Sequence, residues 1–105
     1  MKNLCNRQGC EKNIIHDPET EREIWRMTNF NTHDIHPYYD QFAWSPDGSR
    51  IAFSSIAPED ALDSKGGRTD KGYLFIMNED GSDLKCLVAG VDFSLHVGCF
   101  PIWVD

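Results

Sequence analysis

The residues best suited to chemistry lie together in one polar segment. His33, Asp34, His36 and Asp40 fall within eight residues of one another. Neutral imidazoles and carboxylates bind divalent transition ions, and histidine can act as a general base because it titrates near neutral pH. The same residue types also occur in ordinary solvated loops, where they bond to the local backbone. The segment therefore predicts either a metal or general-base site, with His33 and His36 as the candidate ligands, or a plain loop.

The four cysteines offer a second possible site. Cys5 and Cys10, with His16 nearby, could contribute to a zinc site. Structural zinc sites, however, normally use cysteine pairs two to four residues apart together with a second pair. We therefore expect inert, reduced thiols at Cys5 and Cys10. Cys86 and Cys99 are expected to be small buried apolar residues of strands.

These residues must be positioned by short strands and turns, because 8 glycines and 5 prolines lie mostly between short apolar runs. Pro46-Asp47-Gly48-Ser49 is a tight-turn sequence, and a second turn is expected at 78–82. These turns join the expected strands, which are 41–45, 50–55, 72–77 and 83–88. Residues 22–28 alternate polar with apolar and predict one more strand. Residues 1–20 predict a loose polar arm, 29–36 a loop, and 57–72 an insertion too polar for the core.

Spacing along the chain indicates a repeated unit. Ile24 and Leu84 lie 60 residues apart, as do His36 and His96, and Trp44 lies 59 residues before Trp103. A repeated four-stranded antiparallel meander with an aromatic first strand is typical of a propeller blade. We therefore predict an all-β fold, a fragment of a larger β-propeller. Its parts are an N-terminal arm at 1–20, a closing strand at 22–28, a complete blade at 41–89 and the first strand of the next blade at 99–105.

Two stretches carry a family resemblance. Residues 42–55, with their Ser-Pro-Asp-Gly turn, and residues 74–82, with their Asp-Gly-Ser turn, resemble the TolB-type, WD-repeat-like propeller blade. Residues 16–28, followed by 36–39, resemble the opening of oligogalacturonate lyase-like propellers. The resemblance implies a parent of several blades whose last blade is completed by the N-terminal strand. It further implies that the metal of such a lyase, manganese for example, is held by later blades.

In a meander, alternate loops share a face, so the histidines and the insertion are expected opposite the two tight turns. Loops on a rigid scaffold often form binding sites. The candidate binding residues on this face are His33, Asp34, His36, Tyr38, Tyr39, Asp40 and His96. Of these, Tyr38 and Tyr39 are the candidates for carbohydrate stacking. Trp44 is expected instead to fill the core between blades.

Net charge and hydropathy limit the classes of partner that the chain is expected to bind. The net charge of -7 disfavours nucleic acid, and the apolar runs are too short to cross a membrane. The polar N-terminus lacks a secretory signal, so we expect a cytoplasmic protein. The predicted role is structural or binding, without catalysis by the chain alone. The alternative is part of a lyase that cleaves oligogalacturonate by β-elimination with a divalent metal. Expected partners are further blades, a second copy bound through open strand edges, an oligosaccharide or a protein.

Overall fold

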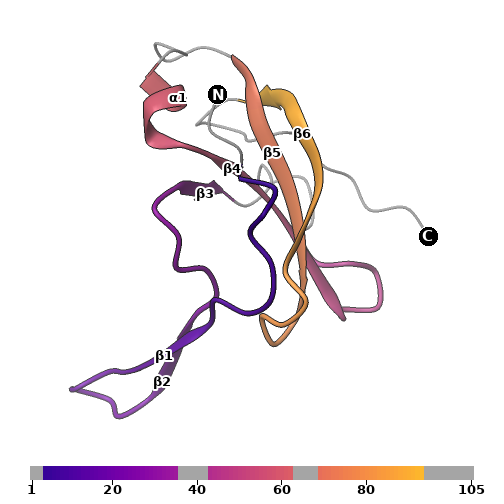
Figure 1. The fold of residues 1–105 in the computed structure, drawn as a ribbon. Coiled ribbons are helices and arrows are strands. Elements are labelled where there is room, and N and C mark those ends of the chain that lie inside the picture. The colour runs from indigo at the N-terminus through magenta and orange to yellow at the C-terminus, as the bar shows by residue number, and fades with distance from the viewer. Residues whose placement is uncertain (1–3, 36–42, 63–68, 94–105) are drawn as a thin grey trace.

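The chain folds mainly into antiparallel β-structure. The structure is a computed structural model and describes residues 4–35, 43–62 and 69–93. Its elements are β1 (Asn13–His16), β2 (Glu23–Arg26), β3 (His33–Ile35), β4 (Arg50–Ile56), α1 (Pro58–Leu62), β5 (Thr69–Asn78) and β6 (Lys85–Phe93). β1 and β2 form a two-stranded hairpin, and the other four strands form one sheet in the order β3-β4-β5-β6 (Figure 1). The expected all-β class is confirmed at this level.

The turn that leads into β4 has the structure that its sequence predicts. The Ser45 amide donates to the Arg50 carbonyl at 2.8 Å, and Gly48 takes a φ of +75°, which a glycine adopts without strain. The Asp47 carboxylate accepts hydrogen bonds from the hydroxyl and amide of Ser49 and from the Ser45 hydroxyl. These bonds stabilise the ionised form and lower the pKa of Asp47 to about 2.

The larger core cluster lies on the face of the sheet that carries Phe53 and Phe75, and β4 is buried on both faces from Ala52 to Ile56. Phe53 and Phe75 are register partners whose rings stack 5.5 Å apart. The buried cluster on this face comprises Leu4, Phe53, Tyr73, Phe75, Met77 and Leu84. A smaller cluster at the other end of the sheet combines Ile56, Ala61 and Phe93.

The expectation of a loose arm at 1–20 is wrong. Leu4 and Arg7 are 1% and 3% exposed, and Gly9 forms two backbone hydrogen bonds with Leu84. The arm also contains β1, which pairs with β2 from Asn13–Arg26 to His16–Glu23. Leu4 covers the apolar face of the sheet, a long-range contact without a local signature. The predicted strand at 22–28 forms as β2, and within the described residues it pairs with β1.

Two predicted loops also contain regular structure. β3 lies within 29–36 and pairs with β4 from His33–Ile56 to Ile35–Ser54. The 57–72 insertion contains α1 and the start of β5, and Ala57 and Ala61 are buried. It is therefore partly core, because small apolar residues on α1 pack where the polar composition suggested solvent.

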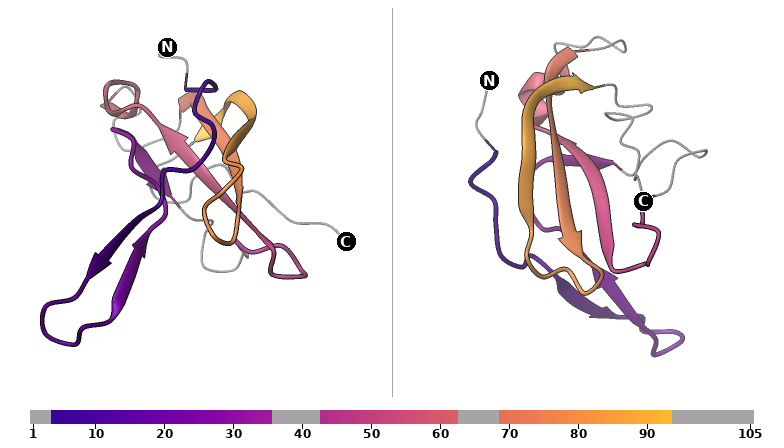
Figure 2. Two further views of the ribbon diagram at one scale, coloured as in Figure 1. Left: turned by 60° about the horizontal axis from the view of Figure 1, so that its bottom comes forward. Right: turned by 90° about the vertical axis from the view of Figure 1, so that its right-hand side faces the viewer.

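Two other expected strands, 41–45 and 99–105, lie partly or wholly outside the described residues. At 41–45, residues 41–42 lie outside the described residues, and Trp44 forms an isolated bridge with Ile51. Residues 99–105 also lie outside them. The β1–β2 hairpin projects from the body of the sheet in both views of Figure 2. Among the described residues, no helix has the length and apolar character needed to span a membrane.

Candidate functional site

Of the predicted binding residues, two lie within the described part of the chain. His33 and Asp34 both lie in β3, where His33 is exposed and Asp34 is partly buried. The remaining candidates lie outside the described residues, and they are His36, Tyr38, Tyr39, Asp40 and His96. Across residues 4–35, 43–62 and 69–93, the His, Cys, Asp and Glu side chains form no group of three that could hold a metal ion.

Asp34 belongs to a buried ion-pair cluster centred on Arg7. The Arg7 guanidinium donates to both carboxylate oxygens of Glu11, at 3.1 and 2.9 Å, and to both of Asp34, at 3.4 and 3.3 Å. It also donates to the hydroxyls of Ser55, at 3.1 Å, and Thr32, at 3.3 Å. Both hydroxyls in turn donate to Asp34. The cluster therefore satisfies its buried charges internally.

The charged groups of the cluster shift one another's pKa values. Burial acts to raise the pKa of Asp34, but hydrogen bonds from Ser55, Arg7 and Thr32 outweigh it and hold the pKa below its ordinary value. Burial likewise opposes ionisation of Glu11, and hydrogen bonds from Arg7 and the Asn29 amide lower its pKa overall. Burial acts to lower the pKa of Arg7, and its bonds to both carboxylates raise it instead.

Two aromatic rings complete the surroundings of Arg7. Its guanidinium carbon lies 4.7 Å from the ring centre of Phe30 and 4.8 Å from that of Phe75. Both distances allow cation–π attraction. Arg7 thus joins the N-terminal segment, the segment before β3 and the central strand β5. This arrangement stabilises the fold and gives Asp34 a structural role.

A disulfide joins the same N-terminal segment to β6. Cys5 and Cys86 are bonded, with their Cα atoms 5.0 Å apart. The expectation of a reduced thiol at Cys5, and of a plain buried apolar residue at Cys86, is therefore wrong. Gly9 pairs with Leu84 and brings the two cysteines together across 81 residues, a proximity that sequence spacing does not reveal. Cys10 is an exposed free thiol, as expected.

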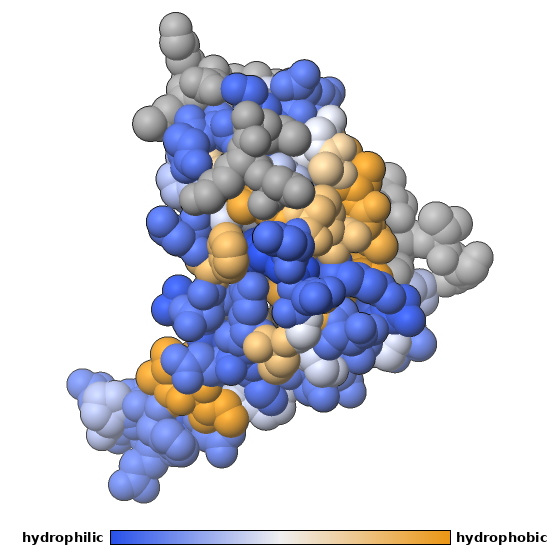
Figure 3. All heavy atoms as spheres, viewed as in Figure 1, coloured by the Kyte–Doolittle hydropathy of each residue, from blue (hydrophilic) through white to orange (hydrophobic). Residues whose placement is uncertain are grey.

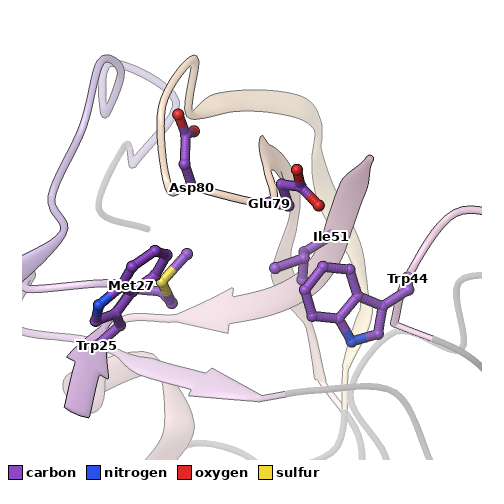
Figure 4. A pocket seen from close by; sticks show the side chains of 6 residues that line it. All are labelled: Trp25, Met27, Trp44, Ile51, Glu79 and Asp80. Atoms are coloured by element: carbon purple, nitrogen blue, oxygen red, sulfur yellow. The ribbon is translucent and has the colours of Figure 1, made fainter. Parts of the chain in front are cut away.

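An apolar hollow lies at the end of the sheet where the tight turns are. Its volume is about 510 Å³, and its lining residues are Trp25, Met27, Trp44, Ile51, Glu79 and Asp80. Figure 4 shows the two indole rings on opposite sides and the two carboxylates along one rim. Trp25 is 48% and Trp44 49% exposed. Half of Trp44 is exposed within the described residues of this chain, so its expected place in a core between blades stays a prediction.

The carboxylates of Glu79 and Asp80 give the rim of the hollow negative charge. Asp80 accepts hydrogen bonds from the hydroxyl and amide of Ser82, which together with the nearby charge of Lys12 lower its pKa and keep it ionised. The Lys12 ammonium already lies 4.0 Å from the centre of the Trp25 ring. One wall of the hollow therefore attracts a cation within this chain.

Sequence reasoning missed this hollow because its parts are far apart in the chain. Trp25 lies in β2 of the hairpin and Met27 directly after it. Trp44 and Ile51 flank the first turn, and Asp80 lies in the second turn. The sequence signals were two tryptophans and two acidic turn residues. Only the position of the hairpin brings them together.

Comparison with known proteins gives this chain no relative: no family model, curated protein or solved structure matches it.

Proposed function

We propose that this chain is a β-sheet assembly module with a binding role. Its four-stranded meander is a propeller-type blade, and it joins another sheet of the same kind through its hairpin and its open edge. A second copy supplies that sheet when the chain is alone. The role is binding, and the chain by itself performs no catalysis.

The observation that carries this proposal is the composition of the β1–β2 hairpin. All residues of both strands are exposed, and the central ones are apolar. Ile14 pairs with Trp25, and Ile15 pairs with Ile24. Because side chains alternate along a strand, these two apolar pairs lie on opposite faces. An isolated two-stranded hairpin is marginally stable in water, and one with apolar pairs on both faces gains from a covering partner.

The outer strand of the sheet supports the same role. Within the described residues, β5 is the one strand paired along β6, and Leu87 and Val88 of β6 are 54% and 42% exposed. Apolar side chains gather over the hairpin at lower left and along β6 at right in Figure 3. A strand edge with free backbone groups and apolar side chains is a template for pairing with another strand.

The order of the strands favours a blade. β3, β4, β5 and β6 are neighbours in sequence and in the sheet, and all pairs are antiparallel. This is the arrangement of a propeller blade. Blades pack face to face with their neighbours, which is consistent with a partner sheet of the same kind.

The proposal is tested by sedimentation equilibrium of the purified chain over about a hundredfold range of concentration. We expect a mass that rises with concentration. The double variant Ile15→Ser/Ile24→Ser removes the apolar pair on the face away from Trp25. It should raise the dissociation constant at least about tenfold, because each buried isoleucine contributes roughly 1.5–3 kcal/mol.

The matched control is Glu19→Ser/Glu21→Ser, which changes two exposed residues of the same hairpin and removes no apolar surface. Its association should equal that of the wild type, and circular dichroism should show the same sheet content in all three proteins. A wild-type chain that stays monomeric at every concentration would overturn the proposal.

A further inference from the structure

We infer that the hollow between Trp25 and Trp44 is a binding site for a basic side chain, an arginine of a partner protein. This site lies at the turn end of the sheet and does not use the Ile15–Ile24 face of the hairpin. It goes beyond the proposed assembly role and stands independently of it.

The walls of the hollow suit a flat cation. Trp25 and Trp44 stand on opposite sides with half of each side chain exposed, and Met27 and Ile51 supply apolar surface between them (Figure 4). A guanidinium is planar and weakly hydrated, so it stacks on indole rings. At about 510 Å³ the hollow also has room for the aliphatic part of the side chain and adjoining backbone.

The rim supplies the opposite charge. Glu79 is exposed, and Ser82 donates both its amide and its hydroxyl hydrogen bond to the Oδ1 atom of Asp80, which holds this carboxylate at the rim. Two carboxylates beside two indole rings combine ion pairing with cation–π attraction. The net charge of -7 further favours a basic partner.

A contact within the chain places a cation beside one wall of the site. The Lys12 ammonium lies 4.0 Å from the Trp25 ring centre, and its charge helps to lower the pKa of Asp80. Neutral sugars also stack on tryptophan, but they are held by matched donors and acceptors. The six lining residues include no amide or hydroxyl side chain. Their chemistry therefore favours a cation over a sugar.

The probe is a short glycine-flanked peptide with a single arginine and blocked ends, compared with the same peptide carrying citrulline. Citrulline has nearly the same shape as arginine and no charge. Binding is followed by NMR through the indole N–H resonances of Trp25 and Trp44. We expect both resonances to shift saturably with the arginine peptide, and the citrulline peptide to bind at least about tenfold more weakly.

Two variants locate the site. Trp44→Ala removes one wall, and Glu79→Gln/Asp80→Asn removes both charges while an amide oxygen keeps the turn bonds of Asp80. Each should weaken arginine-peptide binding about tenfold. The control Glu19→Gln/Glu21→Gln removes the same charge from the hairpin and should leave binding within about twofold of wild type.

The assembly variant Ile15→Ser/Ile24→Ser retains the hollow, so it should bind the peptide as the wild type does even where association is lost. Equal affinity for the arginine and citrulline peptides would overturn the inference. Tighter binding of a neutral oligosaccharide at the same indoles would also overturn it, as would unchanged binding by the Glu79→Gln/Asp80→Asn variant.

Discussion

Replacing Arg7 by methionine should remove the centre of the buried cluster. Methionine retains much of the side-chain volume, but it leaves the carboxylates of Glu11 and Asp34 without their cation. Removing one partner of a buried ion pair costs about 3–5 kcal/mol. Since the carboxylate side chains keep 15% and 14% exposure, we expect the lower end of this range, about 3 kcal/mol. For a chain of this size that corresponds to a melting temperature about 12–24 °C lower.

The loss of stability in Arg7→Met should depend on pH, in a direction set by the pKa values of Asp34 and Glu11. Asp34 and Glu11 have folded pKa values below their ordinary 3.8 and 4.5, so their stabilisation is present above those values and is lost as the pH falls through the folded pKa. In Arg7→Met, burial is no longer offset by the cation, and the carboxyls are stabilised in the protonated form. The difference in unfolding free energy should therefore be largest at neutral pH and should shrink on acidification.

The assay is urea unfolding at one fixed protein concentration, followed by circular dichroism at neutral and acidic pH. Arg22→Met is the matched control, because Arg22 is exposed, and it should stay within about 0.5 kcal/mol of wild type. Arg7→Lys keeps a charge without the planar fork and should lie between wild type and Arg7→Met. Equal stability of Arg7→Met and Arg22→Met would refute the role of Arg7, as would a difference that grows on acidification.

Three further predictions concern the rest of the fold. Reducing the Cys5–Cys86 bond should lower stability by up to about 4.5 kcal/mol, the chain-entropy value for its 81-residue separation, and chemical denaturation with and without reductant measures it. Gly72→Ala should cost about 1–3 kcal/mol in the same assay, because a Cβ there would lie 2.5 Å from the Cβ of Phe93; a neutral effect would contradict this contact. The Asp47 carboxyl should titrate in the folded chain with a pKa of about 2, and carbon-detected NMR showing an ordinary midpoint would mean that the turn bonds do not form.

Local patterns predicted the parts of the fold that depend on neighbouring residues. The turn at 46–49 followed from the conformations of proline, aspartate and glycine, and β4 and β5 followed from their apolar content. The predicted ends of the strands were less accurate, since β5 begins at Thr69, within a stretch that was expected to be a solvated loop. Pairing with β4 and β6 extended it beyond its apolar segment.

Long-range contacts account for what the sequence did not reveal. Nothing around Leu4 or Arg7 marks them as buried, because their partners lie across the sheet. Asp34 was expected at a binding face, and the sequence could not show that Arg7 would pair with it. The hollow was missed for the same reason, since Trp25 and Trp44 meet only in the folded chain. The proposed binding site at 33–40 stays a prediction, because most of it lies outside the described residues.

Amide hydrogen exchange at low and high protein concentration tests the proposed assembly most directly, because it reports on the strands themselves. If the hairpin and the sheet edge join another sheet, the amides of β1, β2 and β6 should exchange more slowly at high concentration, while those of β4, already paired on both sides, should change little. The Ile15→Ser/Ile24→Ser variant should lose this added protection. Exchange in β1, β2 and β6 that is the same at both concentrations would contradict the account.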